Sequence, residues 1–253
     1  MGLLQYETYD AANYTHFLTQ YNFLGPLFPF DDHDDFDKVG IDAAGARYRQ
    51  VFPTLEEVYV HNTSSADTVG ALMRLSMPSE AVAEAGAFAE AWVRVTASAA
   101  GTLNFTLTIY NKTATRLPEA LFFRFAPKPC PRAQCTVHKV SSHVDLDDVV
   151  PGGAHHNHVM SPEGVQCGCA GNGDGDGGGG GAGAGATGFD LRSPDAPLLS
   201  AGTPTAFPTP LNSTASVATD GAALMLWQNI WNTNYIMWTE GDFQFRASVA
   251  LAK

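Results

Sequence analysis

Apolar and polar residues alternate with a period of two along several stretches of this chain, and this pattern limits the fold class more than any other feature. Residues 103–110 carry Leu, Phe, Leu and Ile at every second position, with Asn, Thr and Tyr between them. Residues 243–251 repeat the pattern, and residues 69–76, 89–98 and 121–125 follow it less cleanly. Side chains of a strand point alternately to its two faces, so each stretch predicts a half-buried antiparallel strand.

Two further stretches indicate how the strands are arranged. Residues 224–230 are apolar on both faces, which predicts a central strand. Residues 93–107 are interrupted at Ala100-Gly101 and predict a hairpin. Because 45% of the residues are hydrophobic, the chain can bury a core. We therefore predict a mainly β fold, an antiparallel β-sandwich.

The first 50 residues have a different character. A helical period of i, i+3, i+4 and i+7 joins four apolar side chains: Tyr14, Phe17, Leu18 and Tyr21. Asp10 precedes them as the expected N-cap. A loop with five aspartates follows at residues 31–37. We expect residues 1–50 to form a short helical and acidic lead-in, packed on a β-sandwich domain of residues 51–253.

A glycine-rich stretch interrupts that domain. Residues 171–188 contain 11 of the 25 glycines of the chain, which predicts a flexible, disordered insertion. Matches to G-x-G-x-x-G occur there by composition alone. No strand–helix–strand unit surrounds them, so they predict no nucleotide site.

Charge excludes several classes of partner. The chain has 26 acidic and 14 basic residues, a formal net charge of −12. No basic face is available to neutralise phosphates, so we expect no nucleic-acid partner and no anionic membrane surface. No apolar stretch reaches the length of about 20 residues that a spanning helix needs, which predicts no membrane insertion. The first residues do not resemble a signal peptide.

The sequence leaves the cellular location open. Five N-x-[ST] sequons, more than chance predicts, slightly favour the secretory pathway or an extracellular location: Asn13, Asn62, Asn104, Asn111 and Asn212. The four cysteines allow three pairings, and free thiols are a further alternative. Cys130 and Cys135 are able to close a small loop, whereas Cys167 and Cys169 are too close to pair comfortably with each other.

Metal and catalytic candidates are weak. His155 and His158 are the best metal-ligand candidates, with Cys167 and Cys169 nearby, but the spacing is not that of a zinc site. A strand with histidines facing solvent explains the pattern better, so we predict no cofactor in this chain. A solvated acidic loop likewise explains residues 31–37, and we assign no catalytic residue.

The segment from Gln228 to Trp238 is dense in Trp and Asn. Indole rings stack on the apolar faces of sugars, and amides bond hydroxyl groups. The candidate carbohydrate-binding residues are therefore Trp231, Asn232, Asn234 and Trp238. The alternative, which we favour, is a core strand that ends in a turn, where amide side chains bond backbone groups.

This segment resembles a signature of an uncharacterised family, a domain of unknown function related to family 38 glycoside hydrolases of the α-mannosidase type. The family pattern N-[LI]-W-G-T-N-[FY]-x-x-W, followed by an F-R-F strand, is similar to residues 229–238 and 243–246 here. Further matches follow in order along the chain: the Tyr14 to Tyr21 helix, Leu117 to Leu121, His155 to His158 after a P-G-G turn, and Asp195 to Leu198. The chain departs from the pattern at Asn232, which replaces a glycine, and in its Gly-rich insertion and cysteines.

The resemblance implies a galactose-mutarotase-like supersandwich that supports a catalytic barrel. In α-mannosidases that barrel carries zinc ligands and an aspartate nucleophile, and nothing in this chain matches them. We therefore expect a C-terminal, non-catalytic fragment whose partner is the catalytic domain of a parent protein. The alternatives are a free-standing carbohydrate-binding module and a minimal glycosidase that uses the acidic loop.

Overall fold

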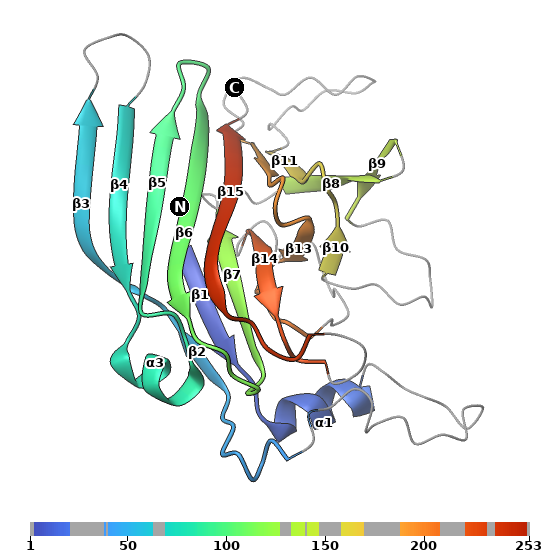
Figure 1. The fold of residues 1–253 in the computed structure, drawn as a ribbon. Helices are drawn as coiled ribbons and strands as arrows, with labels where there is room; N and C mark the ends of the chain where they lie inside the picture. Colours follow the sequence, from blue (N-terminus) through green and yellow to red (C-terminus); the bar gives the residue numbers. More distant parts are fainter. Residues whose placement is uncertain are drawn as a thin grey trace.

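The structure, a computed structural model, describes residues 3–20, 38, 40–62, 69–126, 133–139, 141–146, 158–169, 188–207, 221–231 and 236–251. These residues form two antiparallel sheets and two short helices (Figure 1). The predicted mainly β, antiparallel sandwich is thus confirmed. The predictions for residues 31–37, for residues 171–187 of the Gly-rich insertion, and for His155, Asn232 and Asn234 lie outside the described residues.

The smaller sheet has six strands in the order β10–β13–β14–β7–β1–β2. Its strands are β1 (Leu3–Thr8), β2 (Arg49–Val51), β7 (Glu119–Phe125), β10 (His158–Met160), β13 (Leu198–Ala201) and β14 (Ala222–Gln228). The predicted central strand is β14, which lies between β13 and β7. On the other side of β7 lies β1, with Tyr6 opposite Leu121.

The larger sheet has nine strands in the order β3–β4–β5–β6–β15–β12–β11–β8–β9. Its strands are β3 (Thr54–Asn62), β4 (Val69–Ser76), β5 (Glu90–Ala97), β6 (Thr102–Lys112), β8 (Ala133–Lys139), β9 (Ser142–Asp145), β11 (Val165–Cys169), β12 (Phe189–Arg192) and β15 (Gly241–Leu251). The predicted hairpin is β5–β6, with Val93 opposite Leu107. Strands β4, β5, β6, β7 and β15 lie where the alternation predicts them.

The predicted N-terminal helix is α1 (Ala11–Gln20). The Asp10 carboxylate accepts a hydrogen bond from the Asn13 N–H, and the Asn13 side chain accepts one from the Asp10 N–H, so the helix start is capped reciprocally. Tyr14 and Phe17 are buried, as the helical period predicts. The other helix, α3 (Ser79–Ala85), ends at Gly86, which has a left-handed φ of 69°.

The six-stranded sheet is covered on both faces. Its inner face packs against the nine-stranded sheet through side chains such as Leu121, Phe123 and Phe105, which form the main core. Its outer face carries Ala120 and Phe122, which belong to a second cluster under α1. The rest of that cluster is aromatic and apolar: Tyr9, Tyr14, Phe17, Ile41, Ala206, Phe207, Ala223, Met225 and Ile230. The fold therefore has a partial third layer.

Among the described residues, a disulfide joins two neighbouring strands of the nine-stranded sheet. Cys135 of β8 and Cys167 of β11 are directly opposite each other in the register and are bonded. Both are buried. The sequence alone left the pairing open, and this bond removes Cys167 from any set of metal ligands.

Candidate functional site

Two cavities adjoin each other where residues 38–49 pass across the start of β7. The first, of about 370 Å³, is lined by residues of β1, β2, α3 and the segment 44–47. The second, of about 490 Å³, is lined by eight residues: Lys38, Gly40, Ile41, Ala44, Thr115, Arg116, Leu117 and Met237. Ala44 and Leu117 line both, so the two cavities share a wall.

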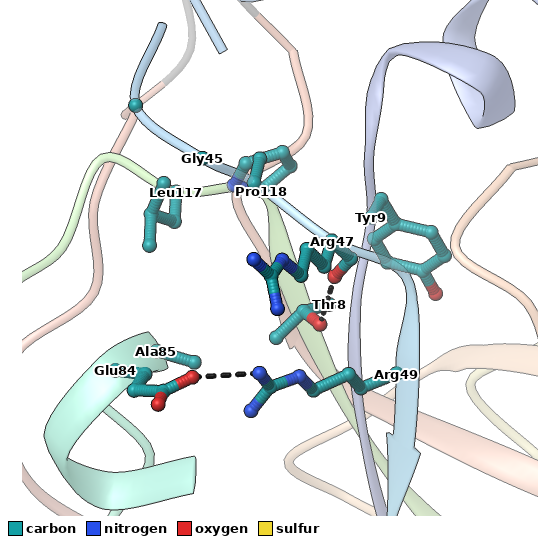
Figure 2. A pocket seen from close by; sticks show the side chains of 11 residues that line it. Thr8, Tyr9, Gly45, Arg47, Arg49, Glu84, Ala85, Leu117 and Pro118 are labelled. Atoms are coloured by element: carbon teal, nitrogen blue, oxygen red, sulfur yellow. Dashed lines mark hydrogen bonds and ion pairs between the residues drawn. The ribbon is translucent and has the colours of Figure 1, made fainter. Parts of the chain in front are cut away.

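Two arginines enter the first cavity from neighbouring positions. Figure 2 shows the side chains of Arg47 and Arg49 extending in the same direction, between α3 and the Leu117–Pro118 wall. Arg49 is neutralised by α3, because its guanidinium lies 3.0 Å from a Glu80 oxygen and 2.6 Å from a Glu84 oxygen. Arg47 is exposed, and its guanidinium has no ion pair or hydrogen bond with the part of the chain that the structure describes.

The second cavity is built around two further cations. Arg116 is exposed, and its guanidinium lies over the ring of Trp238, 5.5 Å from the ring centroid. Lys38 is buried, and its ammonium donates hydrogen bonds of 2.9 Å to the carbonyl oxygens of Arg116 and Met237. Burial lowers the pKa of Lys38 to about 8, although nearby Glu119 opposes the shift.

The segment between the cavities is held at several points. At the start of the segment, Lys38 donates hydrogen bonds to the carbonyl oxygens of Arg116 and Met237. Ile41 is buried in the cluster under α1. The turn closes through a hydrogen bond from the Ala46 N–H to the Ile41 carbonyl. Thr8 then donates a 2.6 Å hydrogen bond to the Arg47 carbonyl (Figure 2). Backbone contacts therefore place Arg47, and its side chain stays available to a ligand.

Asn229 holds in place the cavity wall that is formed by Thr115, Leu117 and Met237. It is buried, and its amide nitrogen lies 3.1 to 3.3 Å from the carbonyl oxygens of Thr115, Leu117 and Met237. Its side-chain oxygen accepts a 2.7 Å hydrogen bond from the Glu119 N–H. The first residue of the Trp/Asn signature therefore has the backbone-bonding role that the favoured alternative assigns to amides in this segment.

A buried ion pair lies beneath this wall. Lys112 Nζ, from the end of β6, is 2.8 Å from Glu119 Oε1 at the start of β7, and both side chains are 0% exposed. Lys112 and Glu119 Oε1 form an ion pair, but their geometry is not that of a hydrogen bond. The other carboxylate oxygen, Oε2, accepts a 2.5 Å hydrogen bond from the Tyr6 hydroxyl. Burial raises the pKa of Glu119 to about 7, against the opposing effects of Lys112 and Tyr6.

Acidic side chains are scarce among the described residues that line the two cavities. Glu119 is enclosed and cannot touch a ligand in either cavity. The described lining contains one carboxylate, Glu84, which is paired with Arg49. Glycoside hydrolysis of the usual kind uses two carboxyl groups about 5 to 9.5 Å apart.

The predicted carbohydrate residues fall in two places. Trp231 is half-buried, and its ring packs on Phe17 at 5.4 Å and on Phe207 at 6.1 Å between centroids. Trp238 is 40% exposed and lies beside the second cavity through its contact with Arg116. Their role in sugar binding stays a prediction.

The histidine candidate is tied to backbone. His158, in β10, has its Nε2 2.5 Å from the Thr205 carbonyl oxygen. Among the described residues, no group of three or more His, Cys, Asp or Glu side chains is arranged to hold a metal ion. Lys38, Arg47 and Arg116 were not singled out from the sequence, because no periodicity or motif marks them.

Comparison with known proteins relates the sandwich to solved structures. No family model and no curated protein matches the chain. A galactose 1-epimerase from Lactobacillus acidophilus NCFM is similar over 78% of this chain and 66% of its own, with 8% identity and a TM-score of 0.39. The Slr1438 protein from Synechocystis sp. PCC 6803 is similar over 77% and 65%, with 12% identity and a TM-score of 0.36. At this level of similarity, neither match carries an argument about fold family or function.

Helices that are long and apolar enough for a membrane span are absent from the described part of the chain.

Proposed function

We propose that this chain is a non-catalytic β-sandwich domain that supports a carbohydrate-active catalytic domain of a longer protein, packing on it through β3. The observation that carries the proposal is an uncovered stretch of the core-facing side of the nine-stranded sheet. Leu55, Val58 and Val60 are opposite Leu75, Met73 and Ala71 in the register. Residues that are paired across strands lie on the same face, and Met73 and Leu75 pack on the main core.

The three β3 side chains share that face and are nevertheless 51%, 51% and 71% exposed. Apolar side chains gathered on an uncovered sheet face mark an interaction surface. β3 is also an edge strand of the described sheet, in which β4 is the one strand that pairs with it. The sequence resemblance to the family 38-related group, in which such a sandwich supports a catalytic barrel, suggests the partner.

Hydrogen exchange on two lengths of the chain tests this proposal. The present chain is compared with one extended by the coding sequence that precedes Met1 in the gene. We expect the amides of residues 54–62 to exchange at least about tenfold more slowly in the longer protein, because the partner covers them. The turn at residues 98–102, which connects β5 to β6, serves as the internal control and should not change. Equal exchange at residues 54–62 in both proteins would contradict the proposal.

A second candidate function, a carbohydrate-binding module, is favoured by the exposure of Trp238 beside the second cavity. The paired variants Trp238→Ala and Trp231→Ala test it on a glycan array and by urea unfolding. If the chain is such a module, Trp238→Ala folds normally and loses binding. Trp231→Ala should lower stability by about 2 to 3 kcal/mol with or without sugar, since its ring packs on Phe17 and Phe207. We expect neither variant nor the parent chain to turn over nitrophenyl glycosides.

A further inference from the structure

We propose that the two adjoining cavities form one anion site, which binds a ligand bearing carboxylate, sulfate or phosphate groups through Arg47 and Arg116. The inference goes beyond the supporting role and does not depend on how β3 packs. The charge around the two cavities differs from the charge of the whole chain. The chain as a whole has a formal charge of −12. The described cavity lining nevertheless has four basic side chains and one acidic: Lys38, Arg47, Arg49 and Arg116 against Glu84.

Two of these cations are already committed to the fold. Arg49 is held between Glu80 and Glu84 on α3. Lys38 donates to two carbonyl oxygens and lies near the buried Glu119. Their hydrogen bonds fix the walls of the cavities.

The other two cations have no acidic partner among the described residues. Arg47 in the first cavity and Arg116 in the second are both exposed, and neither guanidinium makes an ion pair there. A guanidinium presents a planar set of donors that matches the geometry of carboxylate, sulfate or phosphate. One unpaired guanidinium in each of two adjoining cavities therefore favours a ligand with more than one oxyanion group.

The site is also built in advance of binding. The Arg47 backbone is fixed by Thr8, the Leu117 wall by Asn229, and the Arg116 carbonyl by Lys38. Arg116 is further placed by the Trp238 ring beneath it. A ligand then has two long side chains to order rather than a loop, which lowers the entropic cost of binding.

Isothermal titration calorimetry on the full chain at low salt tests the site, with trigalacturonate as the carboxylate probe and maltotriose as the neutral probe of equal length. We expect trigalacturonate to bind and maltotriose to give no heat. Arg47→Met and Arg116→Met should each weaken binding about tenfold or more. Arg47→Lys should retain part of the affinity, because lysine keeps the positive charge but lacks the planar pair of N–H donors that binds an oxyanion through two hydrogen bonds.

The matched control is Arg94→Met. Arg94 is an exposed arginine on β5, away from the cavities, and it has no hydrogen bond or ion pair within the described chain. Its replacement changes the net charge by the same amount and should leave affinity unchanged. Thermal unfolding of all variants checks that each is folded.

Inorganic sulfate and phosphate, titrated in the same way, identify the source of the oxyanion. If they bind with the same dependence on Arg47, the oxyanion itself is sufficient. If trigalacturonate alone binds, the ligand is an acidic saccharide. The proposal is overturned if no anion binds below about 10 mM, if Arg94→Met weakens binding as much as Arg47→Met does, or if maltotriose binds as tightly as trigalacturonate.

Discussion

The ion pair between the two sheets and the ion pairs on the outer face of the nine-stranded sheet have opposite surroundings. Lys112 and Glu119 are both 0% exposed, whereas Arg74 and its partners Glu57 and Glu90 are 34%, 41% and 39% exposed. Burial raises the pKa of Glu119 to about 7 even with an ammonium 2.8 Å away. The pKa of Glu57 is lowered instead, first by the Tyr59 hydroxyl that donates to it and then by Arg74.

The comparison indicates that solvent exposure, more than the identity of the two partners, determines both the pKa of the carboxyl group and the contribution of the ion pair to stability. The buried pair crosses from β6 to β7 and joins the two sheets beneath the cavity wall. The outer pairs join neighbouring strands within one sheet and remain hydrated. We therefore expect substitutions at the two places to differ in size and in pH dependence.

The largest expected effect comes from Lys112→Met. At pH 8 the carboxylate of Glu119 is mostly ionised, and losing its buried partner should cost about 3 to 5 kcal/mol of stability. At pH 5 Glu119 is mostly protonated, so the cost should shrink. Urea unfolding at both pH values measures it. The double variant Lys112→Met with Glu119→Gln is the control and should recover part of the loss at pH 8. If Lys112→Met lowered stability equally at pH 5 and pH 8, the ion pair with Glu119 would not be the way in which Lys112 stabilises the fold.

The covalent link within the nine-stranded sheet gives the next effect. Cys135 and Cys167 are 32 residues apart, and a cross-link over a loop of that length restricts the unfolded chain by about 3 to 4 kcal/mol. The double variant Cys135→Ala with Cys167→Ala should lower the urea midpoint accordingly at every pH. This independence of pH distinguishes it from Lys112→Met. A midpoint that stays within error of the parent chain contradicts the expectation.

Titration of Glu119 should shape the stability of the unmodified chain. The pKa of Glu119 in the folded chain is about 7, above the ordinary glutamate value of 4.5 that applies to the unfolded chain, so the folded state binds this proton more tightly. The resulting stabilisation is complete below about pH 4.5 and is lost as the pH rises to about 7, by up to about 3 kcal/mol. Burial also raises the pKa of Glu7, which contributes with the same sign. Glu119→Gln should flatten the profile between these pH values, and a midpoint that rises over the window would refute this assignment.

Much of the nine-stranded sheet could be predicted from the sequence, because strands such as β5, β6 and β15 have one more exposed face, which the alternation of apolar and polar residues indicates. β1 could not be predicted in this way. Gln5 and Glu7 of that strand are buried, although polar residues normally indicate a solvent face. Their partners, Arg124 and Gln50, are brought close by the fold.

The cavities escaped prediction for the same physical reason. Lys38 acquires its role from carbonyl groups 78 and 199 residues away in the chain, and no local pattern encodes such contacts. Asn229 was within a segment that the sequence did single out, because its neighbours are unusually rich in Trp and Asn. The sequence predicted backbone hydrogen bonds for amides of this segment in general, and the fold identifies the carbonyl groups to which Asn229 binds.

The smallest expected effect is that of Arg74→Met on the outer face of the nine-stranded sheet. Its guanidinium lies 2.9 Å from Glu57 and 3.1 Å from Glu90, which is closer than many surface pairs, yet all three side chains are more than a third exposed. Water solvates both members of each pair in the unfolded and the folded chain, and salt screens their attraction. We expect a loss of stability at pH 7 that is much smaller than the loss for Lys112→Met. Part of even that loss should disappear in about 0.5 M salt, because screening weakens the wild-type pairs as well. Urea unfolding of Arg74→Met and Lys112→Met in parallel, at low and high salt, gives the comparison directly. A cost for Arg74→Met as large as that for Lys112→Met would mean that exposure does not separate the two regions.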